Sequence, residues 1–129
     1  MKLIKNLLEH NKLWLFLAIA WTFIVFYFCL TSSSGLPRFP QYFDKVAHFS
    51  FHFGITLFWF LYFNSLKLNV SLKKALQKAF LLSLSLGIFI EFLQEALTET
   101  RHADVFDVLA NTTGALAVYA IVSLIDSKK

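Results

Sequence analysis

Acidic and histidine side chains recur at helical spacing near residue 45. Asp44, His48 and His52 are separated by four positions each, and residues at this spacing share one face of a helix. An imidazole on such a face can transfer a proton as a general base. Two structural roles compete with this chemistry. Asp44 could cap the N-terminus of a helix, and a histidine on such a face could be tolerated without a function.

A second polar series follows later in the chain at spacings of three, four and three residues. Residues at these spacings form one continuous helix face. Asp104 could be a helix cap, Asn111 could form a hydrogen bond between helices, and Gly114 could allow close helix packing. Capping does not explain Asp107 and Asn111, which would lie one and two turns deeper. The series consists of Asp104, Asp107, Asn111 and Gly114.

Glu91 lies within an otherwise apolar stretch that ends near Thr98, about two helical turns or roughly 10 Å from that end. A carboxylate at such depth in a membrane is costly and indicates a functional site with a partner. The competing structural role is an ion pair with Arg101 or Lys45. One turn before Glu91, Gly87 is typical of close helix packing.

Four apolar blocks must position these residues. Only 16% of the 129 residues are charged, against about a quarter in soluble domains. Each block is long enough to cross a hydrocarbon core of ~30 Å, and a chain in lipid satisfies its backbone polar groups within helices. We therefore predict a single domain over residues 1–129, an all-α integral membrane four-helix bundle in the lipid bilayer. The predicted spans are residues 13–30, 45–66, 79–97 and 105–125, with an amphipathic lead-in at 68–78.

The basic residues predict the orientation of the bundle. Nine of the twelve Lys and Arg residues fall in the two terminal tails or between the second and third spans. Basic residues accumulate on the cytoplasmic side, so both termini are predicted to be cytoplasmic (N-in/C-in). Because these residues separate apolar blocks, the net charge of +4 does not indicate nucleic-acid binding. The nine are Lys2, Lys5, Lys12, Lys67, Lys73, Lys74, Lys78, Lys128 and Lys129; the other three are Arg38, Lys45 and Arg101.

The polar residues converge on the outward ends of the last three spans, so we predict a ligand-binding pocket there. Basic side chains and two helix N-termini would favour a phosphate or carboxylate, whereas the carboxylates with His48 could hold a divalent cation. Candidate catalytic residues are His48, Glu91 and Asp107, and candidate metal ligands are His48, Glu91, Asp104 and Asp107. The predicted ligand-binding residues are Asp44, Lys45, His48, Glu91, Gln94, Arg101, Asp104, Asp107 and Asn111.

Three separated motifs resemble the VanZ-like family of small bacterial membrane proteins, named for a protein linked to teicoplanin resistance. The resemblance covers residues 40–120, whereas the first span matches only in being apolar. It implies a multi-pass protein of the bacterial inner membrane and cell envelope, with a family link to glycopeptide resistance. The motifs are Asp44-Lys45-x-x-His48-Phe49, Glu91-x-x-Gln94 and Arg101-x-x-Asp104-x-x-Asp107-x-x-x-Asn111-x-x-Gly114.

Three functions remain open at the level of sequence. The pocket could bind a lipid headgroup, a lipid-linked cell-wall precursor or a glycopeptide-related ligand. It could instead belong to a metal-assisted hydrolase or transferase that acts on a phosphorylated lipid, although no standard catalytic motif is present. Finally, the polar residues could serve only to hold the helices together.

The predicted orientation can be tested by labelling single cysteines in a Cys29→Ala background, since Cys29 is the only cysteine. An impermeant reagent should label Ser33→Cys from outside, because nine of twelve basic residues lie on the opposite side. Outside labelling of Lys73→Cys together with protection of Ser33→Cys would reverse the model.

Overall fold

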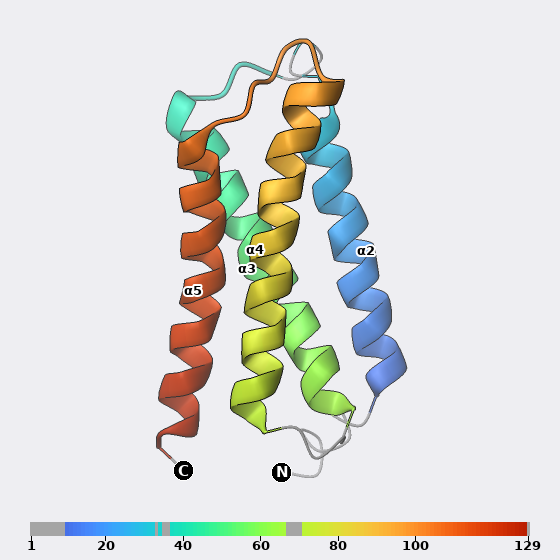
Figure 1. The fold of residues 1–129 in the computed structure, drawn as a ribbon, viewed down its shortest axis with the longest axis vertical. Helices are drawn as coiled ribbons and strands as arrows, with labels where there is room; N and C mark the ends of the chain where they lie inside the picture. Colours follow the sequence, from blue (N-terminus) through green and yellow to red (C-terminus); the bar gives the residue numbers. More distant parts are fainter. Residues whose placement is uncertain (1–9, 33, 35–36, 67–70, 129) are drawn as a thin grey trace.

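The computed structural model of the chain describes residues 10–32, 34, 37–66 and 71–128. This part of the chain is all-helical, as predicted, and contains no strand. Each of its four helices is long and apolar enough to cross a membrane. In Figure 1 they run side by side along the long axis of the molecule. The helices are α2 (Asn11–Leu30), α3 (Gln41–Ser65), α4 (Leu72–Leu97) and α5 (Val105–Asp126).

The starts of two helices differ from the prediction. Helix α3 begins at Gln41 with Pro40 as its N-cap, four residues before the predicted span. Asp44 therefore lies within the first turn, and its interpretation as a helix cap is wrong. Helix α4 begins at Leu72 after Ser71, whose hydroxyl accepts a hydrogen bond from the Lys74 N–H at 3.3 Å. The expected lead-in is thus continuous with the third span from Leu72 onward.

Helix α5 begins where the sequence predicts. Asp104 is its N-cap, and the carboxylate accepts a hydrogen bond from the Phe106 N–H at 2.8 Å. This bond satisfies one of the donors that a helix start leaves free. It also fixes the place at which Asp107, three residues later, enters the helix.

Helices α3 and α4 each pack against all three other helices, and α3 has the more extensive contacts with α2 and α5. In Figure 1, α2 and α5 lie on opposite sides of the bundle, and the α2–α3 and α4–α5 connections share one end. The antiparallel order agrees with four successive spans. The cytoplasmic placement of the termini remains a prediction, and four of its lysines and the labelling position lie outside the described residues: Lys2, Lys5, Lys67, Lys129 and Ser33.

The interior changes from apolar to polar along the bundle axis. One apolar cluster joins the C-terminal halves of α3 and α5 to the start of α4, and a second joins α2 to the middle of α3 and α4. Nearer the shared connections the buried side chains are polar. These clusters consist of Phe60, Ala75, Leu76, Ala79 and Val118, and of Val25, Cys29, Ile55 and Ile90.

The outer surface carries many exposed apolar side chains. Phe23 is 71% exposed and Leu124 is 62% exposed. Soluble monomers rarely expose continuous apolar surface on this scale, whereas lipid-facing helices do so necessarily. The outer surface therefore fits the bilayer that the sequence predicts.

Gly114 allows α5 to approach the backbone of α3. A Cβ at this position would overlap the carbonyl oxygen of Phe49 and lie 3.1 Å from the Phe53 nitrogen. Gly87 of α4 is similar, since a Cβ there would lie 3.1 Å from both Asn111 Nδ2 and His52 Cε1. Both glycines therefore have the close-packing role expected from the sequence.

We expect Gly114→Ala to destabilise the bundle by about 1–3 kcal/mol, the usual cost of overpacking. The sign of this stability change is informative, because Ala in a helix interior is otherwise favoured over Gly by roughly 1 kcal/mol. Thermal unfolding in detergent measures the change. The exposed Ala120→Val on the same helix is the control, and unchanged or increased stability of Gly114→Ala would contradict the close contact.

Candidate functional site

A pocket of about 1420 Å³ opens at the end of the bundle that holds the α2–α3 and α4–α5 connections. Its charged lining comes from the first turns of α3 and from the segment before α5. A smaller, mostly polar hollow adjoins it and includes Asp107 and Gln94. Seven of the nine predicted ligand-binding residues line one of these two hollows, whereas Glu91 and Asn111 line neither and contact residues that do. The charged and imidazole side chains of the larger pocket are Asp44, Lys45, His48, Arg101 and Asp104, together with Arg38.

Lys45 joins the starts of α3 and α5. Its Nζ donates hydrogen bonds to Asp104 Oδ2 at 2.6 Å and to Asp107 Oδ1, and it lies 3.6 Å from Asp44 Oδ2. Asp107 is only 4% exposed, so its charge is removed from water. A buried carboxylate is costly unless it is paired, and Lys45 supplies the pairing charge.

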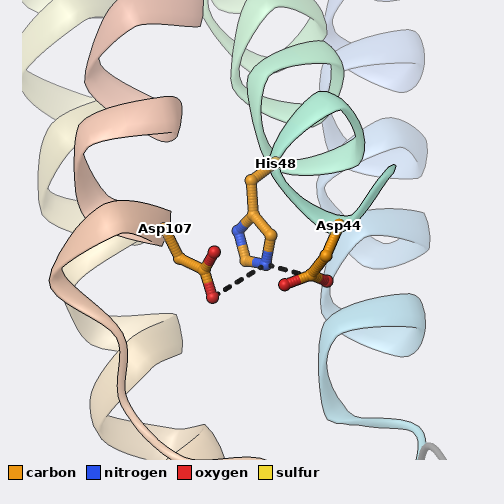
Figure 2. Close-up of side chains that lie close together, drawn as sticks. All are labelled: Asp44, His48 and Asp107. Carbon is orange, nitrogen blue, oxygen red and sulfur yellow. Dashed lines mark ion pairs between the residues drawn. The ribbon is translucent and has the colours of Figure 1, made fainter. Parts of the chain in front are cut away.

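His48 is 1% exposed and has a defined orientation. Its Nδ1 lies 3.0 Å from Asn111 Oδ1. Because a carbonyl oxygen only accepts, Nδ1 carries the proton. Figure 2 shows the other ring nitrogen, Nε2, between two carboxylates, 3.6 Å from Asp107 Oδ2 and 3.9 Å from Asp44 Oδ1. In the neutral ring Nε2 is therefore a lone-pair donor that faces two acids.

Glu91 is 4% exposed and holds the segment before α5. Its Oε2 accepts a hydrogen bond from the Asp104 N–H at 3.0 Å. Its Oε1 is buried without a hydrogen-bond partner among the described residues and lies 3.9 Å from His48 Nδ1. The ion pair with Arg101 or Lys45 that the sequence left open does not form in this structure.

Arg101 belongs to the loop between α4 and α5 and is largely covered. Its Nη1 lies 3.8 Å from Asp44 Oδ1, which is longer than a hydrogen bond. Its Nε is buried and has no hydrogen-bond partner in the described part of the chain. The guanidinium therefore retains unused donor capacity beside the pocket.

Asp104 is the more exposed partner of Lys45, with 38% of its side chain accessible. The pKa of this carboxyl is lowered from its usual value, chiefly by the hydrogen bond from Lys45 and then by that from the Phe106 N–H. Because the folded state lowers the pKa, the carboxylate stabilises the fold above about pH 4, and this contribution is lost as pH falls through the lowered pKa.

Two predicted polar residues are occupied within the bundle. The amide nitrogen of Gln94 donates a hydrogen bond to the carbonyl oxygen of Cys29 at 2.8 Å, which links α4 to α2. His52, one turn deeper than His48, has its Nδ1 2.9 Å from Ser83 Oγ. His52 thus fits the structural role that the sequence left open for it.

The sequence did not identify the apolar part of the pocket. Aromatic side chains also line the pocket, and no periodicity distinguishes them from lipid-facing residues. They are Phe28, Phe39, Tyr42, Phe43, Phe51 and Phe106.

The sequence also did not include Asp44 among the metal candidates, although its spacing of four from His48 was visible. Asp44, His48 and Asp107 each place one ligand atom within 4.8 Å of the others, whereas Glu91 and Asp104 are outside this group.

We expect Lys45→Met to reduce the free energy of unfolding by about 1–3 kcal/mol, since it leaves the Asp107 carboxylate buried without its cation. Adding Asp107→Asn should recover part of the loss, because the unpaired charge is then removed. Thermal unfolding of the two single variants and the double variant measures this coupling. Lys73→Met, at an exposed position of α4, is the control, and strictly additive effects would show that the pair contributes nothing.

A family model described as VanZ/LLP1 matches residues 3–126 of the 129-residue chain. Comparisons with curated proteins and with solved structures give no significant match. The match extends beyond the three motifs to include the first span. The chain therefore belongs to the VanZ/LLP1 family.

Proposed function

We propose that the chain binds the phosphorylated headgroup of a membrane lipid in the pocket at this end of the bundle. The observation that supports the proposal is a pocket with a charged floor and an aromatic rim, formed by helices that are long and apolar enough to span a bilayer.

The rim suits the apolar part of a lipid. Phe39 and Phe43 stack with ring centroids 4.6 Å apart, and Tyr42 between them in sequence is 70% exposed. All three line the pocket. Aromatic side chains are favoured at the level of lipid headgroups, where one end of a molecule is apolar and the other is wet.

The floor offers groups that bind phosphate. Arg101 has an Nε without a hydrogen-bond partner among the described residues, and a guanidinium binds phosphate through two parallel donors. Helices α3 and α5 both begin at this end, and their N-termini favour anions. Lys45 is already shared among carboxylates, so Arg101 is the principal candidate for contact with phosphate.

A lipid-linked cell-wall precursor carries the same phosphate chemistry. Its diphosphate would use the same floor, and its polyprenyl chain would use the same rim. Such a ligand would connect the site with the glycopeptide resistance implied by the family resemblance. The test therefore includes both classes of phosphorylated lipid.

Hydrolysis or transfer at the bound headgroup is a second candidate function. The observation that favours it is His48, which lines the pocket and whose Nδ1 bond to Asn111 leaves Nε2 facing the Asp44 and Asp107 carboxylates. A nitrogen held in this way can act as a general base. Conversion of a bound phosphorylated lipid by the purified protein, abolished by His48→Gln, would establish this function.

The binding proposal predicts selective retention of phosphorylated lipids by the purified protein. Native mass spectrometry should detect phosphatidylglycerol and a polyprenyl diphosphate on the wild type, and less diacylglycerol. Arg101→Gln should weaken this binding about tenfold or more, because a charge-assisted hydrogen bond contributes roughly 1.5–3 kcal/mol.

Glu99→Gln is the matched control, since Glu99 lies in the same loop and does not line the pocket. Equal retention of phosphorylated and unphosphorylated lipids would refute the proposal. Preference for the polyprenyl diphosphate alone would restrict it to cell-wall precursors.

A further inference from the structure

We infer that Asp44, His48 and Asp107 form a binding site for a divalent transition-metal ion of the Zn²⁺ or Mn²⁺ type. One ligand atom from each residue lies within 4.8 Å of the other two. Figure 2 shows the imidazole between the two carboxylates, with Asp44 and His48 on α3 and Asp107 on α5. The metal site stands on these residues alone; only its contact with a lipid phosphate rests on the proposed function.

Each carboxylate divides its two oxygens between a cation and the centre of the site. Asp107 turns Oδ1 to Lys45 and Oδ2 to His48 Nε2. Asp44 places Oδ2 near Lys45 and Oδ1 near His48 Nε2. The neighbouring lysine thus occupies only the outer oxygens, and one oxygen of each acid remains directed at the imidazole.

Asn111 orients the third ligand atom, which is His48 Nε2. His48 donates its Nδ1 proton to Asn111 Oδ1 at 3.0 Å, which leaves the Nε2 lone pair directed between the acids. Histidine ligands of metals are typically oriented by a second hydrogen bond of this kind. His48 is 1% exposed, and its Nε2 makes no hydrogen bond within the described residues. This nitrogen belongs to an almost wholly buried ring that also lines the pocket, and it is aimed at two carboxylates, so it is placed to bind a cation together with them.

The distances fit a shared cation better than direct hydrogen bonds. The separations from Nε2, 3.6 Å to Asp107 and 3.9 Å to Asp44, exceed hydrogen-bond length. Atoms bound to one metal at ~2.1 Å with tetrahedral angles lie roughly 3.4 Å apart. The three ligand atoms, which lie within 4.8 Å of one another, would complete the coordination by moving closer to this separation.

The charges around His48 also favour a cation. Four carboxylates lie around the ring or its immediate neighbours, and ion pairs among the described residues join them to two permanent cations; Arg38 also lines the pocket and is not counted in this group. Within the group, two negative charges remain in excess when His48 is neutral and all four acids are ionised. A divalent ion would balance this excess and would separate Asp44 from Asp107. The acids are Asp44, Glu91, Asp104 and Asp107, and the cations are Lys45 and Arg101.

The ligand types restrict the metal. Mg²⁺ and Ca²⁺ prefer sites made of oxygen alone, whereas an imidazole with carboxylates suits first-row transition metals and Zn²⁺. Three protein ligands leave a coordination position open. His48 and Asp44 line the pocket, so the open position would face the space in which we place the lipid phosphate, and the metal would link that anion to an acidic floor.

The test is titration calorimetry of the full-length protein in detergent after chelator treatment and desalting. Zn²⁺ and Mn²⁺ are titrated separately, with Mg²⁺ and Ca²⁺ as comparators and no lipid added. We expect one ion of Zn²⁺ or Mn²⁺ per chain, bound more tightly than Mg²⁺ or Ca²⁺. Asp44→Asn and His48→Gln should each weaken binding by at least ~10-fold, since even outer-shell partners of metal ligands contribute 10–100-fold.

The control is the double variant Glu95→Gln/His102→Gln. These residues form another carboxylate–imidazole pair at the same end, 3.6 Å apart, but both side chains are more than half exposed. Its affinity and stoichiometry should equal those of the wild type. Thermal unfolding without metal shows whether each variant is folded. If His48→Gln does not fold, the test is decided by Asp44→Asn, which changes a partly exposed side chain.

Three results would overturn the inference: no binding to the wild type, preference for Mg²⁺ or Ca²⁺, or binding that Asp44→Asn leaves unchanged. Because lipid is absent from the titration, its outcome is independent of lipid retention. A protein that binds metal without retaining lipid would refute only the proposed function, and one that retains lipid without metal would refute only this inference.

Discussion

The site depends on charge neutralisation between α3 and α5. Asp107 lies in an interior of low dielectric constant, where a lone carboxylate would be strongly disfavoured, and the Lys45 ammonium makes its burial tolerable. The same ammonium reaches Asp104, the residue that caps α5. The start of α5, the start of α3 and the buried Asp107 are therefore fixed relative to one another by one side chain.

Close backbone packing complements this electrostatic link. Gly114 lies about two turns below Asp107 and lets α5 touch the backbone of α3 at Phe49. At this separation the amide of Asn111 reaches the ring of His48, and Gly87 admits both Asn111 and His52 beside α4. The polar and the small residues thus serve one arrangement: the glycines set the distances at which the polar side chains meet.

The sequence was sufficient for the features that depend on local pattern. Hydropathy over some twenty residues defines each span, and Asp104 before an apolar run predicts a cap. The start of α3 was placed too late, because Pro40 as an N-cap allows four further residues to become helical. Asp44 consequently changed from a cap to a neighbour of His48.

What could not be predicted is how each helix is rotated about its axis. The spacing of Asp107 and Asn111 puts them on one face but does not show which residue of α3 they meet. The partners of Glu91 illustrate this. Two cations were candidates from the sequence, yet the carboxylate accepts the backbone N–H of Asp104, a donor that no side-chain pattern reveals. The aromatic rim was missed for the same reason, since Phe and Tyr also face lipid elsewhere.

The antiparallel order of the helices has a consequence for biogenesis. The polar contacts of the site run from α3 to α4 and α5, so they join the second half of the chain to the first. As synthesis proceeds from the N-terminus, α3 enters the bilayer before its partners exist. Lys45 and His48 must then remain near the headgroups or in contact with the insertion machinery until α5 is complete. The last apolar segment therefore acts as the closing element of the folding process, and truncation before Asp104 would leave three helices in which Lys45 and Glu91 lack their partners.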